Sequence, residues 1–425
     1  NKMKKFQSVR GMRDILQIEA KSFRDLENHL ISVTNQFGFE EIKTPILEDT
    51  NLFIKSIGDG TDIVEKEMYT FHDSKNNPIS MRPEGTASCA RALIEHGKSD
   101  IINKVWYSGP FFRHERPQKG RYRQFHQFGV EFTGVGGFEA DFEIINLANQ
   151  IWDNLKIKPT LLINSIGDSE DRKKYIEVLL EYLKKYESDF DDNEKNKLKS
   201  NPLRILDTKS KKIKKILESA PNINDYLSES AKSHFNYLLE LLDEKKISYI
   251  QDSNLVRGLD YYNRTVFEYL DNTENSQNTI CAGGRYDYLF KSLCDREVPA
   301  LGFAIGIERL MDYINFSTTN KEKVQFYLIV LDQENHSYSQ TVAKIIRSTS
   351  EKFTVYHSYS YKNLKTQLKK ADKLSSDYCV IIGNEERKKN ICQIKKMSSG
   401  EQENIYIDKL TDFLKEKIIA GIQDE

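Results

Sequence analysis

The sequence predicts an α+β fold, in which strand-rich segments surround a helical stretch and a smaller α/β domain follows. An arginine-rich run at 111–127 has the pattern of two strands joined by a loop. Residues 168–250 are rich in Lys, Glu, Asp, Leu and Tyr, nearly lack glycine, and predict a mostly helical insertion. After residue 324, strand and helix patterns alternate, which is typical of a small sheet covered by helices.

Composition limits the class of protein. The 425 residues suit two or three domains, and 38% hydrophobic and 30% charged residues fit a soluble globular chain. The basic N-terminus has no apolar core after it, and no apolar run is long enough for a bilayer, so we expect neither a secretory signal nor a membrane partner. With a net charge of −1, a nucleic-acid partner would need locally concentrated positive charge.

The cysteine pattern favours a reducing, cytoplasmic location. Five scattered cysteines, none in a C-x-x-C pair, predict neither a disulfide framework nor structural zinc. His114 and His126 flank the arginine-rich run, but two histidines without further ligands are more often packing groups than a metal site. We therefore expect no metal site made by the protein alone.

The first elements in chain order are a helix and a strand. Apolar positions at helical spacing predict a helix over 18–37, with Gly38 as its C-cap glycine. A strand is expected over 39–44, ending at Pro45. Taken alone, this unit is an ordinary helix and strand.

Two pairs of polar residues are candidates for contact with a ligand. In 81–87, a helix follows a strand, so Thr86 could cap the helix and Glu84 could face a cationic ligand. The alternative is a plain turn with a cap. Gln127 and Glu131 share one face of the strand that follows the arginine-rich run. The alternative there is an edge strand with two solvent-facing residues.

The run 111–127 is the most informative stretch. Four arginines and a lysine alternate with aromatic residues, and Pro117 and Gly120 break the run in the middle. Arginine forks hold phosphate oxygens and an aromatic ring stacks on a base, so the predicted hairpin suits a nucleotide. The alternative is a solvated, charge-rich hairpin.

Later stretches add further candidates. In 255–268, the hydroxyls and rings of Tyr261 and Tyr262 suit a flat ring ligand, and Arg257 is a fixed cation. The alternative is a strand with aromatic cross-strand pairs. Paired glycines that would let a strand approach a ligand are Gly283 and Gly284.

The remaining elements complete the domain plan. In the insertion, Tyr175 to Tyr186 form a helical stripe and the charge run 187–199 reads as a solvated face. Residues 314–323 are polar and predict a linker. Beyond it, strands are predicted at 324–331, 354–356 and 378–382, and helices at 339–350 and 364–374.

Taken together, these stretches resemble the histidyl-tRNA synthetases, a family of class II aminoacyl-tRNA synthetases. The second histidine-specific signature departs from the family at Tyr288, where a glycine is common. The matching segments are the three class II motifs at 18–45, 111–127 and 300–310, the R-P-E-G-T run at 82–86, the histidine-specific signatures at 257–262 and 281–287, and basic stretches of the anticodon-binding domain at 362–373 and 395–402.

The resemblance implies a mainly antiparallel catalytic sheet flanked by helices, with the helical insertion emerging from it and an α/β anticodon-binding domain after it. The expected boundaries are 1–167 and 251–323 for the two parts of the catalytic core, the second including the linker, 168–250 for the insertion and 324–425 for the anticodon-binding domain.

The resemblance also implies a histidine–tRNA ligase, which activates histidine with ATP to histidyl-adenylate and transfers it to tRNA-His. Arg113 and Arg257 would be catalytic. ATP would be bound by Arg113, Glu115, Arg121, Tyr122, Phe125 and Arg309. Histidine would be bound by Glu84, Thr86, Gln127, Glu131, Arg257, Tyr261, Tyr262, Gly283 and Gly284.

Partners follow from the same resemblance. Mg²⁺ would bridge the phosphates and be held mainly through ATP oxygens and water. Gln118, in the hairpin loop, would meet the acceptor end of the tRNA, and the family implies a homodimer. The alternative is a non-catalytic regulatory subunit of ATP phosphoribosyltransferase, which resembles the same core but generally lacks the C-terminal domain and loses catalytic residues.

Overall fold

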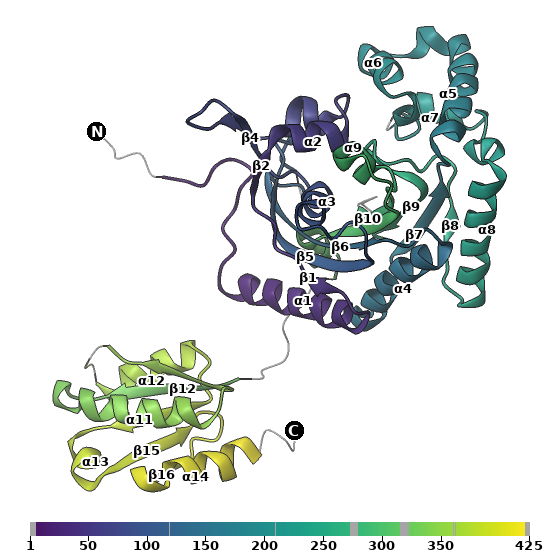
Figure 1. Cartoon of the computed structure of the whole chain (residues 1–425). Helices are drawn as coiled ribbons and strands as arrows, with labels where there is room; N and C mark the ends of the chain where they lie inside the picture. Colours follow the sequence, from purple (N-terminus) through teal and green to yellow (C-terminus); the bar gives the residue numbers. More distant parts are fainter. Residues whose placement is uncertain are drawn as a thin grey trace, which may run out of the picture. The chain divides into compact units, whose positions relative to one another are not determined.

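The computed structural model describes residues 6–118, 120–208, 210–272, 279–314, 323–359, 361 and 363–420. The chain forms two compact units, Asn1–Ser317 and Thr318–Glu425 (Figure 1). The division falls within the stretch expected as a linker, of which residues 315–322 lie outside the described residues. The second unit begins a few residues before the boundary expected for the C-terminal domain.

Within the described residues, the first unit is built on an eight-stranded sheet in the order β1-β5-β6-β11-β10-β9-β7-β8. Pairs from β5 through to β7 are antiparallel, while β1 and β8 join the two edges in parallel. The mainly antiparallel sheet is therefore confirmed. The strands are β1 (Glu40–Glu41), β5 (Asn103–Phe112), β6 (Gln124–Thr133), β7 (Thr160–Ser165), β8 (Ile250–Gln251), β9 (Asn263–Leu270), β10 (Thr279–Arg285) and β11 (Ala300–Gly306).

Helices α1 (Gln17–Gln36), α4 (Phe138–Leu155) and α10 (Ile307–Ile314) cover one face of this sheet. On β6, Phe128, Val130 and Phe132 are buried in the core against these helices. Because side chains alternate along a strand, the odd-numbered residues of β6 face the other side. The opposite face carries α2 (Thr50–Ile57), α3 (Thr86–Glu95), α9 (Leu289–Cys294) and a small sheet of β2 (Leu47–Asp49), β4 (Pro78–Met81) and β3 (Thr70–His72).

One expected strand is shorter, and a strand considered only as an alternative does not form in its first part. The segment 39–44 pairs with β5 only at Glu40 and Glu41, and after the Ile42 amide bonds to the Trp106 carbonyl (2.8 Å) the chain leaves the sheet edge. Pro45 cannot donate to a ladder, which favours that departure. The segment 255–262 is a loop rather than a strand, because β9 begins only at Asn263.

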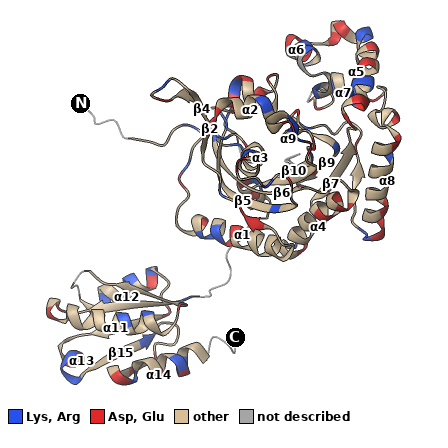
Figure 2. Ribbon diagram, in the orientation of Figure 1, with Lys and Arg blue, Asp and Glu red and all other residues tan. Residues whose placement is uncertain are grey.

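The insertion is helical, as expected. Figure 2 shows acidic and basic residues mixed along its outer helices, which fits a solvated surface. Buried residues of the insertion before α8 share one hydrophobic cluster with Tyr261, Tyr262 and Tyr286 of the core, and those of α8 join the cluster of the main sheet. The insertion therefore packs on the core as part of the first unit. Its elements are α5 (Ser169–Leu183), η2 (Lys184–Asp189), α6 (Asp192–Ser200), η3 (Pro202–Ile205), α7 (Lys211–Leu217), η4 (Ile223–Tyr226) and α8 (Glu229–Glu244).

The second unit is a mixed sheet, five strands within the described part of the chain, in the order β13-β12-β14-β15-β16. The expected strands and helices are present, and the basic turn near 397–400 joins two further strands that the sequence pattern had not indicated. Lys362, expected in a basic helix, lies outside the described residues. The elements are β12 (Val324–Val330), α11 (His336–Thr349), β13 (Phe353–His357), α12 (Leu364–Lys373), β14 (Tyr378–Ile382), α13 (Asn384–Lys389), β15 (Ile391–Lys396), β16 (Gln402–Tyr406) and α14 (Leu410–Phe413).

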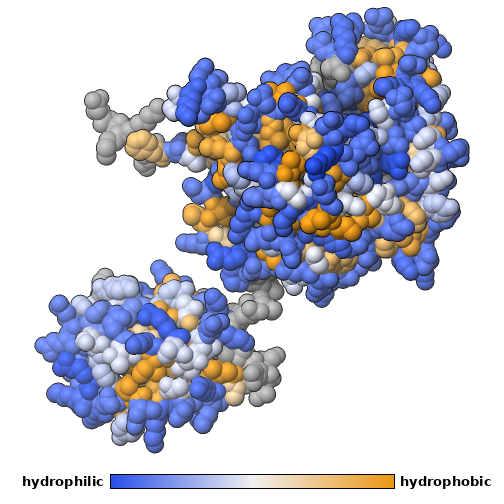
Figure 3. Space-filling view, viewed as in Figure 1, coloured by the Kyte–Doolittle hydropathy of each residue, from blue (hydrophilic) through white to orange (hydrophobic). Residues whose placement is uncertain are grey.

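In the view of Figure 3, the surface of each unit is mostly hydrophilic and carries separate hydrophobic patches. Among the described residues, none of the helices combines the length and the apolar character needed to span a bilayer.

Candidate active site

Side chains from distant parts of the first unit converge on one cleft with a volume of about 420 Å³. The cleft lies on the sheet face that Gln127 of β6 and Gly302 and Ala304 of β11 present, away from α1 and α4. Most residues expected to bind a ligand line it: Glu84, Thr86, Arg113, Glu115, Arg121, Tyr122, Phe125, Gln127, Arg257, Tyr261, Tyr262 and Arg309.

Four expected residues do not line the cleft. Glu131 lies beneath its floor and contacts lining residues. Gly283 and Gly284 sit within β10, where an added Cβ would lie 2.2 Å from the Gly302 carbonyl oxygen and 2.6 Å from the Thr265 carbonyl oxygen, respectively. These two glycines therefore allow close strand packing. Gln118 forms a bridge with Arg121 in the hairpin loop.

A buried carboxylate defines the bottom of the site. Glu131 accepts hydrogen bonds from the hydroxyls of Thr86 (2.8 Å), Tyr107 (3.2 Å) and Tyr286. Burial raises the pKa of Glu131 to about 8, although the hydrogen bonds from Tyr286 and Thr86 act to lower it. Near neutral pH the Glu131 carboxyl group therefore keeps a proton, which a ligand could displace or share.

The start of α3 differs from the expectation for Thr86. Gly85 is the N-cap, and the Glu84 carboxylate accepts hydrogen bonds from the backbone amides of Thr86 (2.7 Å) and Ala87 (2.9 Å). Thr86 as the helix cap is therefore wrong, because Glu84 already satisfies the first amides. This leaves the Thr86 hydroxyl free to donate to Glu131, while burial raises the pKa of Glu84.

The arginines of the hairpin surround the outer part of the cleft. The Arg113 Nε donates to the Pro83 carbonyl (2.8 Å), and its guanidinium lies 5.4 Å from the centre of the Phe125 ring. Arg121 lies 3.5 Å from a Glu115 oxygen. The guanidinium of Arg113 and the ring of Phe125 therefore lie together on one surface of the cleft.

Arg309 connects the hairpin tip to β10. Its Nε donates to the Gly120 carbonyl (3.1 Å) and its Nη1 to the Thr279 carbonyl (2.9 Å). Burial lowers the pKa of Arg309, and the neighbouring Arg121 lowers it further. The mutual repulsion of two neighbouring guanidinium groups favours the binding of an anion between them.

Arg257 reaches the cleft from the opposite side. It forms an ion pair with Glu268, and its guanidinium lies 5.8 Å from the Tyr262 ring centre. Burial lowers the pKa of Arg257, but the charge of Glu268 and the neighbouring tyrosines together outweigh burial, and the net shift of the pKa is upward. Its buried Nε has no hydrogen-bond partner among the described residues.

Several functional side chains were missed in the sequence. Tyr107 and Tyr286 complete the Glu131 pocket, and Glu308 accepts from the His126 backbone (3.0 Å) and faces its Nδ1 (2.8 Å), tying α10 to β6. Tyr286 lies inside the 281–287 signature, which could have indicated it. Tyr107 and Glu308 carry no local signal beyond their position on a strand and a helix.

Two protein-family models match this chain. A sequence model described as histidyl-tRNA synthetase matches residues 11–310, and one described as anticodon binding domain matches residues 325–417. Both units of the chain are thus covered.

Individual relatives match over nearly the whole chain. A histidine–tRNA ligase of Marinomonas sp. (strain MWYL1) is 40% identical over 422 residues, covering 98% of this chain and 100% of the relative. A histidine–tRNA ligase of Buchnera aphidicola subsp. Schizaphis graminum is 44% identical, covering 94% and 95%. The apo crystal structure of S. aureus histidyl-tRNA synthetase superposes with a TM-score of 0.80 at 32% identity, covering 97% and 100%.

Proposed function

This chain belongs to the histidyl-tRNA synthetase family, and from that premise we propose that the cleft is where it activates histidine. Its activity is that of a histidine–tRNA ligase: histidine and ATP give histidyl-adenylate and pyrophosphate, and tRNA-His then takes the histidyl group. The observation that carries the proposal is the convergence of Arg113, Arg257 and Arg309 on one cleft beside the Glu131 pocket.

Different pairs of arginines bind different phosphates of ATP. Arg113 and Arg257 hold the α-phosphate and the histidine carboxylate, and Arg121 and Arg309 hold the outer phosphates. The unpartnered Nε of Arg257 supports its role, because a buried donor without a partner gains most from an incoming oxygen.

Glu115, Tyr122 and Phe125 seat the adenine. Phe125 already lies under the Arg113 guanidinium, and a base stacked on that ring would add contact area next to a fixed cation. Glu115 lies between Arg113 and Arg121 and keeps both forks near the same place.

Histidine binds between two sets of side chains. Glu84, Thr86 and Gln127 hold its main-chain groups, and Glu131, Tyr261 and Tyr262 define the ring pocket. The Gln127 Oε1 is buried and has no partner among the described residues, which suits an ammonium donor. A buried site made for hydrogen bonds rejects amino acids that leave its groups unpaired.

The chemical step depends on positioning and charge. The histidine carboxylate attacks the α-phosphorus and pyrophosphate leaves, while Arg113 and Arg257 stabilise the charge on the α-phosphoryl oxygens. Mg²⁺ supplies further charge neutralisation when it arrives with the phosphates, held mainly by their oxygens and by water. The described residues contain no group of three or more His, Cys, Asp or Glu side chains arranged to hold a metal ion.

The finer partners belong to the same proposal. Gln118 meets the acceptor end of the tRNA, whose 3′ hydroxyl takes the histidyl group, and the second unit reads the anticodon. The chain acts in the cytoplasm as a homodimer; exposed apolar side chains near the first class II motif support a partner there, namely Leu16, Ile18, Ile46, Leu47 and Phe71.

One experiment tests the assignment. ATP–pyrophosphate exchange is measured with each of the twenty amino acids in turn. Exchange with histidine alone is expected. No exchange with any amino acid would contradict the proposal and favour the regulatory-subunit alternative.

A further inference from the structure

We infer that Arg204 of the helical insertion is a positioning residue for adenylation, because it holds the backbone of the segment 257–262 that carries Arg257 and Tyr261. This role rests on the proposed function of the cleft. It would give the insertion a task in the chemistry of the catalytic core, since Arg204 lies in η3, far from Arg257 in sequence.

The Arg204 side chain joins three parts of the chain. Its Nη1 donates to the Gly60 carbonyl (2.6 Å), in the loop after α2, and its Nη2 donates to the Gly258 carbonyl (3.1 Å). The same Nη2 lies 3.3 Å from an Asp260 carboxylate oxygen, and the Arg204 side chain is only 12% exposed. A planar fork can serve these separate acceptors together, whereas a lysine ammonium is a single point charge.

Asp260 is held from other directions as well. The Asn201 side-chain amide, at the start of η3, donates to its carboxylate (2.7 Å), and the Asp260 amide donates to the Ile57 carbonyl (3.1 Å). A Cβ at Gly58 would lie 2.3 Å from an Asp260 oxygen, and the positive φ of 101° also requires glycine there. The signature segment is thus enclosed between η3 and the end of α2.

A second arginine of the insertion holds the other end of the segment. The Arg172 Nη1, on α5, donates to the Tyr262 carbonyl (2.7 Å). Leu203 and Ile205, on either side of Arg204, are buried in the same hydrophobic cluster as Tyr262. The position of η3 and the positions of Tyr261 and Tyr262 therefore depend on each other.

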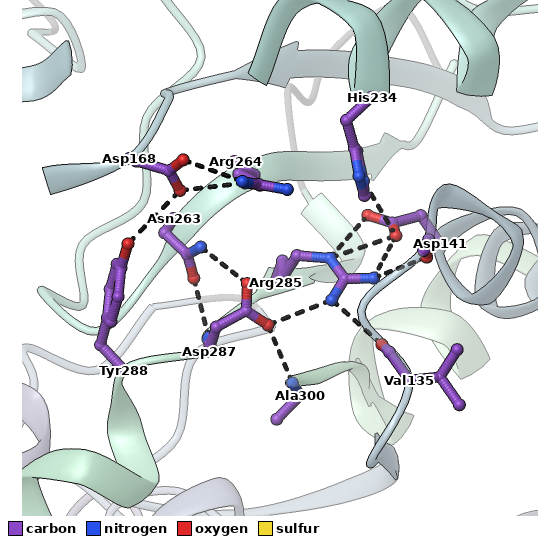
Figure 4. Close-up of polar contacts among 11 residues, drawn as sticks. Val135, Asp141, Asp168, His234, Asn263, Arg264, Arg285, Asp287, Tyr288 and Ala300 are labelled. Carbon is purple, nitrogen blue, oxygen red and sulfur yellow. Dashed lines mark hydrogen bonds and ion pairs between the residues drawn. The ribbon is translucent and has the colours of Figure 1, made fainter. Parts of the chain in front are cut away.

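The contact continues into β9 and β10 (Figure 4). Asp168, directly before α5, accepts from the Arg264 Nε and Nη2 (2.9 Å each) and from the Tyr288 hydroxyl (3.4 Å). The Asn263 amide donates to Asp287 (2.9 Å). Tyr288, the departure from the usual signature, thus adds a link between the second histidine signature and the insertion.

The segment 257–262 needs such support because it belongs to no strand or helix. No neighbouring strand donates hydrogen bonds to its carbonyl groups. Arginine side chains of the insertion donate to two of them instead, at Gly258 and Tyr262. Arg257 must meet the α-phosphate within a narrow range, and a shift of about 1 Å in a reacting group can lower a rate roughly a hundredfold.

The test compares Arg204→Ala and Arg204→Lys with Lys212→Ala, an exposed position in the same insertion whose ion pair with Asp189 (2.8 Å) lies away from the cleft. Histidine-dependent ATP–pyrophosphate exchange, the KM for histidine and the melting temperature are measured on the full chain. We expect Arg204→Ala to lower kcat/KM roughly a hundredfold, with a higher KM for histidine and a nearly unchanged melting temperature. Arg204→Lys should lie between Arg204→Ala and the wild type, and Lys212→Ala should match the wild type.

The outcomes are distinguishable. If the wild-type chain shows no histidine-dependent exchange, the proposed function fails and not the role of Arg204 alone. If Arg204→Ala exchanges at the wild-type rate, or loses activity only in proportion to its folded fraction at an unchanged KM, the positioning role is wrong. If Arg204→Ala does not fold, Arg204→Lys is judged by the same criteria.

Discussion

The hydroxyl of Tyr286, the residue directly after β10, donates a hydrogen bond to Glu131 of β6, although β11 lies between these two strands in the sheet. Gly302 of β11 is paired with Glu131 in register, and a Cβ at this position would lie 2.2 Å from a Glu131 carboxylate oxygen. The carboxylate can cross the intervening strand because residue 302 has no side chain. The pocket floor therefore depends on one glycine between its two partners.

Gly302→Ala should damage histidine binding. The new methyl group would collide with the carboxylate and with the Val130 carbonyl, each 2.2 Å away. Losing one or more buried hydrogen bonds at about 1–3 kcal/mol should raise the KM for histidine about tenfold or more in pyrophosphate exchange. Gly136→Ala is the matched control, because its nearest contact, with Pro299, is at 3.5 Å. Equal KM values in the two variants would contradict this account of the pocket.

Glu131→Gln should change how stability depends on pH. The pKa of Glu131 is raised by burial from 4.5 to about 8, so the folded state binds a proton more tightly than the unfolded state. The stabilisation of the folded state by this bound proton is complete below about pH 4.5 and is lost as pH rises through about 8. The free energy of unfolding of the wild type, relative to the glutamine variant, should fall between pH 5 and pH 9 by up to a few kcal/mol in urea titrations. A constant difference would show that Glu131 is not protonated in the fold.

Arg257→Ala should abolish adenylation while histidine still binds. The guanidinium stabilises charge that develops on the α-phosphoryl group, so its loss should lower the exchange rate by roughly three orders of magnitude. Histidine binding, measured by calorimetry without ATP, should weaken because Arg257 also holds the carboxylate, but it should survive because Glu131 and Gln127 remain. Near-normal exchange would overturn the role assigned to Arg257.

Arg285→Met should destabilise the first unit. Arg285 is fully buried, and its ion pair with Asp141 joins β10 to α4 beside His234 of α8 (Figure 4). Burial alone would raise the pKa of Asp141, but the charge and hydrogen bonds of Arg285 and His234 together outweigh burial and hold that pKa well below its usual range. Without the guanidinium, the buried Asp141 carboxylate would lose its main ionic partner and keep its contact with His234 (3.2 Å), which should cost about 3–5 kcal/mol in urea unfolding.

The control for that variant is Arg296→Met. Its ion pair with Asp100 (2.8 Å) is exposed, and exposed pairs contribute about 0–1 kcal/mol. Similar losses of stability in the two variants would contradict a special role for the buried pair.

Removal of Mg²⁺ by a chelator should stop the reaction without changing the stability of the fold. If Mg²⁺ is held mainly through ATP oxygens, excess EDTA should stop pyrophosphate exchange and added Mg²⁺ should restore it. The melting temperature of the chain without ATP should not change. A large fall in melting temperature on chelation would point to a metal held by the protein itself.

The sequence by itself determined the features that depend on neighbouring residues along the chain. Apolar spacing predicted α1, the alternation of charge and rings predicted the hairpin of β5 and β6, and short motifs indicated Arg257 and Glu131. Such patterns are readable because helix and strand periodicity and turn residues act over a few positions. The roles of the motif residues came from the resemblance to a family.

Only the tertiary structure decided which side chains complete the site. Tyr107 and Glu308 join it through strand register and helix placement, and Thr86 turns from the helix end to Glu131. The contact of Arg204 with Gly258 likewise joins segments far apart in the chain. Hydrogen bonds of this kind depend on which strands become neighbours and which positions lack a side chain, and neither is encoded in a local pattern.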